Sequence, residues 1–320
     1  MFTAVSMREY LAQLRMLKGE KVGDRNVGII VAAGDIIFGE SAPGGIGADT
    51  TAKLLRKARN DESVEAIVLR VDSPGGSAFA AEIIADEIRA LRTAGKPVVA
   101  SMSSVAASGG YSISASTDRI FAAPATITGS IGVFGMFPTY QRTMRALGMA
   151  NDGVGTTPFS GQLRPDREMS EETRQLFQLV IEDTYDDFIS DVAIQRGLEK
   201  QAVDRVGQGQ VWSGIDALNF GLVDELGSLE DAIASAAGLA ELGEGEYGTK
   251  LIEFELSASE QFLIDILTLV ARAGFDVSAW GREPSAVEML AREIGERADT
   301  LLRFNDPRGV YSHCLCESIR

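Results

Sequence analysis

Hydrophobic runs alternate with amphipathic segments along the first half of the chain. Val64–Val71 (VEAIVLRV) is a β-rich run, and Ala80–Ala94 after it carries apolar residues at helical spacing. A second β-rich run, Pro97–Met102, follows, so the pattern predicts a strand, a helix and a parallel strand. Asn26–Gly39 and Asp49–Asn60 repeat the order of strand and helix. The sequence therefore predicts an α/β fold with a largely parallel sheet.

The second half of the chain predicts shorter elements around one long helix. Ser170–Arg196 has acidic residues in its first turn and apolar residues at helical spacing, as expected for such a helix. The pattern also predicts short elements at 119–122, 143–147, 149–157 (a strand), 201–209, 212–221, 222–226 and 228–239.

A shift in composition divides the chain near its C-terminal third. Glu241–Gly248 is rich in glycine and glutamate, which is typical of a boundary. We expect an N-terminal helical arm or linker at 1–25, a main domain at 26–240 and a mostly helical C-terminal extension at 241–320. Within that extension, Leu251–Leu256 predicts an isolated strand, and 262–270 and 286–302 predict helices.

The charge and hydropathy exclude several partners. The formal charge of −16 argues against nucleic acid and anionic lipid, because most of the exterior would repel them. The N-terminal segment lacks the apolar core of a signal peptide, and no stretch is apolar for long enough to span a bilayer. We expect a soluble chain, or one whose membrane anchor lies in another segment.

A small-residue segment, Val105–Ala115 (VAASGGYSISA), contains the first candidate nucleophile. Ser108 follows a predicted strand and precedes Gly109 and Gly110, which let the chain bend sharply and approach another molecule closely. A turn between strand and helix presents a side chain beside free N–H groups that stabilise negative charge. Acyl transfer needs this geometry, although a tight packing turn has the same composition.

A second glycine-bearing loop, Asp72–Ser77 (DSPGGS), follows the strand predicted at Val64–Val71. Open α/β sheets place ligand sites at the carboxyl ends of such strands. The N–H groups of Gly75 and Gly76 stay accessible there, although paired glycines also serve close packing. With a nucleophile on one loop and amide donors on the other, the two loops predict a site that stabilises an oxyanion.

A nucleophilic serine needs an adjacent base, and the chain offers few. The only histidine, His313, lies in a tail far from the other candidates, which argues against a Ser-His-Asp triad. A neutral lysine is the alternative, but no lysine occurs between Lys96 and Lys200. We expect Lys96 at the opposite end of its strand from Ser108, and Lys200 at the surface end of a helix.

The two cysteines, Cys314 and Cys316, are separated by one residue. A disulfide between them would close a small, strained ring, so we expect no disulfide framework. With His313 they form an H-C-x-C sequence that would supply part of a metal site, but the remaining ligands are not evident. We expect a plain tail, with no metal and no cofactor.

Four segments resemble one family of peptidases. VLRVDSPGGS, KPVVASMSSVAASGGYSISA, ITGSIGVFG and QGQVWSGIDALNFGLVDELGSLEDAI are similar to motifs of the signal peptide peptidase, or protease IV, family of Ser-Lys peptidases. The resemblance covers roughly residues 26–240. The tail FNDPRGVYSHCLC is similar to the end of the double-length members.

The resemblance implies a fold of the Clp protease and crotonase superfamily, a spiral of ββα units with a mostly parallel sheet. It implies that Ser108 is the nucleophile and that the backbone N–H groups of Gly75 and Gly109 form the oxyanion hole. The candidates for supporting roles are Gly76, Gly110 and Ser130, and a packing role is equally open for the serine.

The family's base is a lysine. Single-copy members carry it in the part that matches Thr156–Gly161, where this chain has TTPFSG. In double-length members the N-terminal copy supplies the lysine and the C-terminal copy the serine. The chain resembles the serine-bearing copy alone, so we expect it to be catalytically incomplete and the other copy to carry the membrane anchor.

By the same resemblance, we expect a serine endopeptidase that hydrolyses apolar peptides such as cleaved signal peptides. Its setting would be a ring-like homo-oligomer at the outer, periplasmic face of a bacterial inner membrane. Two other functions stay open on the sequence. One is acyl-CoA hydration or isomerisation, which uses paired backbone amides without a serine nucleophile. The other is a non-catalytic scaffold or regulatory subunit, which the missing lysine keeps in consideration.

Overall fold

The computed structural model describes residues 23–41, 45–157, 159–243, 245–253 and 304–315. Met1–Ile252 and Asn305–Arg320 form one compact unit, and Glu253–Phe304 form a second. Every element described below belongs to the first unit. The helices predicted within residues 1–25 and at 262–270 and 286–302 lie outside the described residues.

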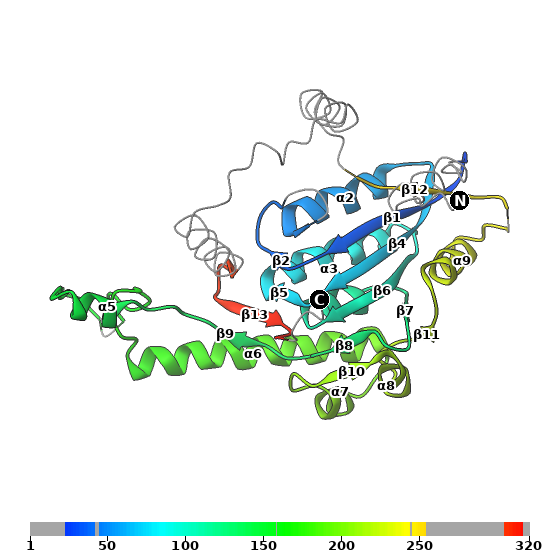
Figure 1. Ribbon diagram of the computed structural model, residues 1–320. Coiled ribbons are helices and arrows are strands. Elements are labelled where there is room, and N and C mark those ends of the chain that lie inside the picture. Colours follow the sequence, from blue (N-terminus) through cyan, green and yellow to red (C-terminus); the bar gives the residue numbers. More distant parts are fainter. Residues whose placement is uncertain (1–22, 42–44, 158, 244, 254–303, 316–320) are drawn as a thin grey trace, which may run out of the picture. The chain divides into compact units, whose positions relative to one another are not determined.

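The larger sheet is mostly parallel (Figure 1). Its described strands, in spatial order, are β10 (Val211–Ser213), β8 (Ile127–Gly129), β6 (Val98–Ala107), β4 (Val64–Ser73), β1 (Asn26–Ala33) and β12 (Gly248–Leu251). Off this path, β7 (Arg119–Ala122) pairs with β6 and with β11 (Glu225–Leu226). Among these pairs only β10 with β8 is antiparallel. The predicted α/β class with a largely parallel sheet is confirmed.

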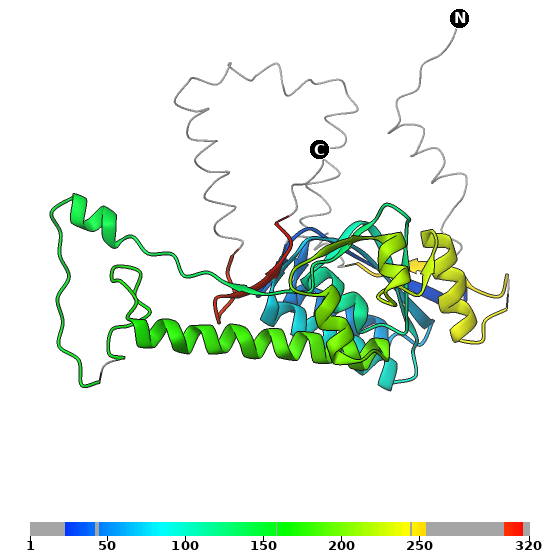
Figure 2. The same cartoon turned by 90° about the horizontal axis from the view of Figure 1, so that it is seen from below.

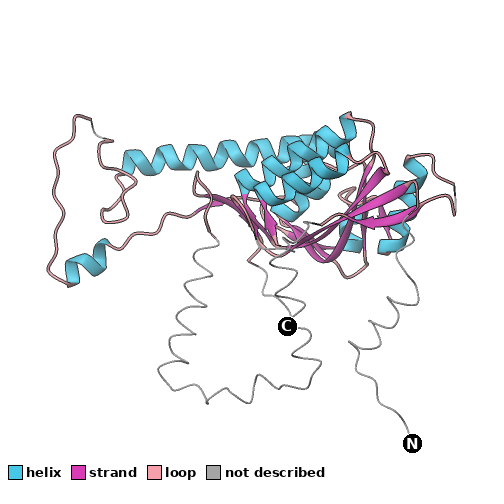
Figure 3. Ribbon diagram, turned by 90° about the horizontal axis from the view of Figure 1, so that it is seen from above, coloured by secondary structure: helices cyan, strands magenta, loops and turns pink. Residues whose placement is uncertain are grey.

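Both faces of the central strands are buried, because their side chains alternate between two apolar layers. Ile67 and Leu69 on β4 face one cluster, and Ala66 and Val68 face the other. The first cluster is covered by α2 (Ala48–Asn60), α3 (Ala78–Thr93), α4 (Gly109–Ala115) and part of α6 (Glu171–Arg196). The second is covered by α9 (Leu229–Leu239). Figure 3 shows the strand layer with helices packed along it.

A smaller sheet gathers short strands from distant parts of the chain. Its described strands, in spatial order, are β3 (Ile46–Gly47), β2 (Ile36–Ile37), β5 (Gly75–Ser77), β13 (Val310–His313) and β9 (Phe134–Gly135). The chain twice forms a long strand of the larger sheet, then short strand structure in this one, and then a helix: β1, β2, β3 and α2 first, and β4, β5 and α3 next. These are the ββα units that the resemblance implies.

Three predicted strands differ from the structure. The run Asn26–Gly39 splits into β1 and β2, because Gly34 turns the chain with φ of +95°. Residues 149–157 form no strand. The strand expected at Leu251–Leu256 overlaps β12 only at Leu251; residues 252 and 253 are not in a strand, and 254–256 lie outside the described residues. β12 itself pairs in parallel with β1.

The long helix α6 matches its prediction. The Ser170 side chain caps it by accepting from the N–H of Thr173, and Gly197 ends it in the left-handed conformation. Phe188 is buried in the core, whereas Leu176 near the start is 55% exposed. Figure 2 shows α6 running beside α7 (Lys200–Val206), with α8 (Gly214–Asn219) close by and α5 (Gln141–Ala146) apart from them.

None of the helices in the described part combines the length and the hydropathy that crossing a bilayer requires.

An ion pair holds the edge strand β12 to the start of β4. Lys250 Nζ lies 2.6 Å from Asp61 Oδ2, and this contact is the largest cause that lowers the pKa of Asp61 from 3.8 to about 2. Because the folded-state pKa is depressed, the pair stabilises the fold above about pH 4 and is lost as the pH falls through about 2.

We expect Lys250→Met to lower the free energy of unfolding by about 1 kcal/mol at neutral pH, since the lysine is partly exposed. The deficit should shrink between about pH 4 and pH 2, where Asp61 becomes protonated in both proteins. Urea titrations across this pH range measure the difference in the free energy of unfolding. Lys53→Met, which removes an exposed ion pair with Glu40, is the control. A deficit that does not change with pH would show that the lysine acts through packing alone.

Candidate active site

Ser108 lies at the junction between β6 and α4, where the chain turns sharply. It is the N-cap of α4, with φ of 56° and ψ of −116°, a backbone conformation that residues other than glycine rarely adopt. Holding it costs about 1 to 3 kcal/mol, which the surrounding packing must offset. The residue is only 1% exposed. Strained backbone of this kind is concentrated at functional sites.

The hydroxyl of Ser108 points toward the segment between β8 and β9. Ser108 Oγ donates to the carbonyl of Gly132 at 3.3 Å, and its backbone N–H donates to Gly129 O at 2.8 Å. Its carbonyl accepts from the N–H of Ser112 in the first turn of α4. A base that activates the serine must therefore draw its proton away from a weak hydrogen bond to a carbonyl.

The two predicted oxyanion donors are in contact. A Cβ on Gly75 would lie 2.7 Å from the backbone nitrogen of Gly109 and would collide with the carbonyl oxygen of Ser312. Gly75 has φ of +102°, and its N–H donates to Ser73 Oγ at 3.1 Å. Gly109 is the first residue of α4, a position whose N–H has no acceptor within the helix. Two backbone N–H groups thus lie close to Ser108, and that of Gly75 must leave Ser73 Oγ before it can bind an oxyanion, so their catalytic role stays a prediction.

The supporting glycines have a packing role that is visible in the structure. A Cβ on Gly76 would collide with the carbonyl oxygen of Ile36, and one on Gly110 would lie 2.7 Å from Ser73 O. These positions let the two loops and α4 approach each other closely. Ser130 is buried with φ of 50°, and its N–H donates to Gln210 O at 2.6 Å. A helper role for this serine therefore stays a prediction.

The C-terminal tail lies against the site, contrary to the expectation that His313 would be far from it. β13 pairs antiparallel with β5, and this register sets His313 opposite Gly75. His313 Nε2 lies 3.3 Å from Asp35 Oδ1. The sequence pattern did not indicate this placement, because strand pairing between residues more than 200 positions apart leaves no periodic signal.

The expectation that the cysteines form no disulfide is also wrong for Cys314, which is disulfide-bonded. Its N–H donates to Pro74 O at 2.7 Å, so this residue too lies beside the glycine loop. Cys316 lies outside the described residues. In the described part of the chain, no group of three or more histidine, cysteine, aspartate or glutamate side chains is arranged to hold a metal ion.

Lys96 and Lys200, which border the long stretch without lysine, lie where we expected them from the sequence. Lys96 Nζ donates to the carbonyls of Ala58 and Asp61, before the start of β6, whereas Ser108 follows the end of that strand. A strand of this length separates its ends by about 30 Å. Lys200 pairs with Asp186 on the surface. Neither lysine is placed to act as the base.

A cavity of about 680 Å³ opens beside Gly132, whose carbonyl accepts the hydrogen bond of the Ser108 hydroxyl. Its lining includes Ser130, Gly132, Tyr185 and His313. Burial, and then the hydrogen bond to Asp204, raise the pKa of Tyr185 to about 12, so its phenol stays protonated at neutral pH and is not the base.

A second cavity, of about 440 Å³, lies between α4 and β13, which both contribute residues to its lining. Its lining includes Phe79, Ser112, Val133 and Ser312, together with acidic side chains of α6 such as Asp187. Ser112 is one helical turn after Ser108, which does not itself line this cavity. Most of its lining is polar or charged, because acidic side chains of α3 and α6 line it together with Arg89 and Arg308.

Relatives of known sequence cover nearly all of this chain. Protease 4 of Salmonella typhi is 41% identical over 295 residues, which are 92% of this chain and 47% of that protein. Protease 4 of Haemophilus influenzae is 39% identical over 97% of this chain and 50% of its own length. The chain thus spans about half the length of these relatives. A putative protease of Synechocystis is 35% identical, covering 62% of this chain and 72% of the relative.

Among solved structures, a ClpP1 mutant from Listeria monocytogenes aligns with a TM-score of 0.41 at 16% identity, covering 64% of this chain and 94% of that one. The model of peptidase family S49 matches residues 90–243, which include Ser108, α6 and α9. On this family model and the sequence relatives, the chain belongs to peptidase family S49.

Proposed function

We propose that the chain is the serine-bearing module of an endopeptidase, with Ser108 as its nucleophile. The observation that carries this proposal is the contact between Gly75 and the backbone nitrogen of Gly109, next to a serine held in a strained conformation. Attack of Ser108 Oγ on a peptide carbonyl forms a tetrahedral intermediate whose oxyanion accepts from these two N–H groups. Its collapse releases the amine and leaves an acyl-serine, which water then hydrolyses.

The general base is a lysine from a homologous copy. Lys96 and Lys200 make their contacts far from Ser108. The chain spans about half the length of its Protease 4 relatives, so the other half of such a relative is long enough for a second copy. The cavity of about 680 Å³ beside Gly132 supplies a path by which such a side chain reaches the hydroxyl. There the lysine takes the Ser108 proton and later gives it to the leaving amine.

The substrates are apolar peptides, such as cleaved signal peptides, in an extended conformation. The cavity of about 680 Å³, whose lining includes Val133, Phe134 and Ile181, holds one apolar substrate side chain. Exposed leucines on the first half of α6, Leu176 and Leu179, form part of a contact surface in a homo-oligomer at the outer face of a bacterial inner membrane.

The purified chain should hydrolyse an apolar fluorogenic peptide only when a lysine-bearing N-terminal copy from a Protease 4 relative is added. A positioned general base contributes about 10²-fold to 10⁴-fold, so we expect a rise of at least about 100-fold on mixing. Ser108→Ala in the mixture is the control and should remove this gain.

Strong activity of the chain alone, lost in Ser108→Ala, would contradict the proposal. In that case His313→Gln decides whether the histidine opposite Gly75 is the base. Binding of a coenzyme A thioester without acylation of Ser108 would instead favour hydratase or isomerase chemistry.

A further inference from the structure

The C-terminal tail docks onto the start of α3 through one buried carboxylate. Asp306 is 8% exposed, and both of its oxygens accept hydrogen bonds. Oδ2 accepts from the hydroxyl of Ser77 and from the N–H of Phe79 at 3.1 Å. Oδ1 accepts from the N–H of Arg308 at 2.7 Å and of Val310 at 3.3 Å. Asp306 therefore joins the first turn of α3 to the turn that leads into β13.

The position of this carboxylate suits its charge. The N-terminus of a helix carries a partial positive charge, and acidic side chains in the first turn usually complement it. α3, all of whose residues are described, has no acidic residue in its first turn. Ser77 caps the helix by accepting from the N–H of Ala80 at 3.0 Å. Asp306, 229 residues away in sequence, supplies the missing negative charge and binds the capping serine.

The same contact reaches the glycine loop, because Ser77 is the last residue of β5 and Gly75 is the first. β13 pairs with all three residues of β5. The N–H of Cys314 donates to the carbonyl of Pro74, just before the strand. The tail thus holds the glycine loop at both ends, through Asp306 at Ser77 and through Cys314 at Pro74.

We propose that Asp306 is a positioning residue of the active site, which holds the Gly75 N–H where the oxyanion forms. It acts through Ser77 and the pairing of β5 with β13, and it touches no reacting atom. The proposal rests on the assignment of Ser108 and Gly75 under the proposed function, and it adds that residues 305–314 are part of the catalytic architecture.

Asp306→Asn tests this role with little change in volume. All four contacts of the carboxylate are made by donors, so the NH₂ group of asparagine must face two of them. Asp231→Asn is the matched control, because Asp231 accepts from the N–H and the hydroxyl of Ser228 at the cap of α9. Both variants remove a negative charge from the start of a helix, but only one of these helices begins beside Gly75.

In the mixture with the lysine-bearing copy, we expect Asp306→Asn to lower kcat for peptide hydrolysis by about 10-fold to 100-fold, with KM nearly unchanged. Affinity for a peptide aldehyde, which forms an oxyanion on the serine, should fall in parallel. Backbone amides of residues 75–79 should exchange hydrogen faster in this variant. Asp231→Asn should leave kcat, the aldehyde affinity and this exchange as in the unmodified chain.

Unchanged exchange at 75–79, or an equal loss of kcat in both variants, would overturn the proposal. A rise in kcat in Asp306→Asn would also overturn it, and would identify β13 as a strand that obstructs the site. Hydrogen exchange needs no activity, so it decides the role of Asp306 in holding the loop even if the mixture proves inactive. An inactive mixture counts against the proposed function alone.

Discussion

Replacing Gly75 with alanine is expected to lower the rate of peptide hydrolysis by at least about 100-fold. Alanine keeps its backbone N–H, but the new Cβ would push the loop away from both Gly109 and Ser312 and so displace this donor. Loss of one oxyanion donor costs about 10²-fold to 10³-fold. Its φ of +102° adds strain that glycine avoids. The measurement is kcat/KM of the chain with the lysine-bearing copy, beside the affinity for a peptide aldehyde.

Gly95→Ala separates the backbone strain from the collision. Gly95 has φ of +83°, but a Cβ there would meet nothing within 4 Å. This control should lose some stability and keep its activity. If Gly75→Ala hydrolyses peptides at the rate of Gly95→Ala, the Gly75 N–H is not an oxyanion donor.

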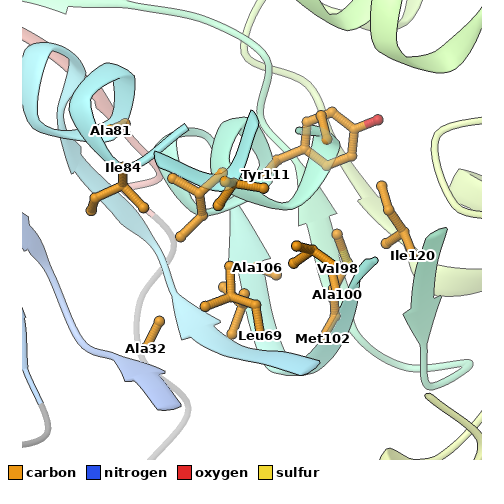
Figure 4. Close-up of a cluster of buried hydrophobic side chains, with 14 of the residues drawn as sticks. Ala32, Leu69, Ala81, Ile84, Val98, Ala100, Met102, Ala106, Tyr111 and Ile120 are labelled. Carbon is orange, nitrogen blue, oxygen red and sulfur yellow. The ribbon is translucent and has the colours of Figure 1, made fainter. Parts of the chain in front are cut away.

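Tyr111→Ala is expected to produce the largest loss of stability, about 3 to 5 kcal/mol in the free energy of unfolding. Tyr111 is fully buried on α4, three residues after Ser108, and Figure 4 shows its ring above the strands that carry Leu69 and Ala106. Its hydroxyl donates to Leu222 O at 3.0 Å, and burial raises the pKa of the phenol. Removing the ring leaves a cavity under the helix that presents Ser108.

Two further variants calibrate this result in urea denaturation. Tyr111→Phe keeps the packing and leaves Leu222 O without this donor, so it should cost about 1 kcal/mol. Tyr140→Ala, at a side chain that is 49% exposed, should change stability by less than about 0.5 kcal/mol. A Tyr111→Ala protein as stable as Tyr140→Ala would show that α4 is not fastened through this ring.

The elements that the sequence predicted well are those with a strong local pattern. β4 is buried on both faces and is rich in β-branched and other apolar residues, and Ser170 caps α6, whose apolar residues recur at helical spacing. The strand predicted at 149–157 failed, because a few apolar residues there have no neighbouring strand with which to pair. Pairing, rather than composition, decides whether such a segment becomes a strand.

The sequence predicted only those parts of the candidate site that lie in short local segments. Ser108, Gly75 and Gly109 stand out because small residues follow predicted strands, and the structure brings all three together. Asp306 and His313 were missed, since their place depends on an antiparallel pairing between segments far apart in sequence. The only signal was the polar turn NDPRG before a short apolar run, which alone does not name its partner strand.

Because β13 pairs with β5, the two strands of this pair are synthesised at different times. Ser77 leaves the ribosome 229 residues before Asp306, an interval of about 10 to 50 s at typical rates of translation. During that interval β5 exists without β13, with which all three of its residues pair. The smaller sheet is therefore completed only after β13, the last described strand of the chain, has emerged.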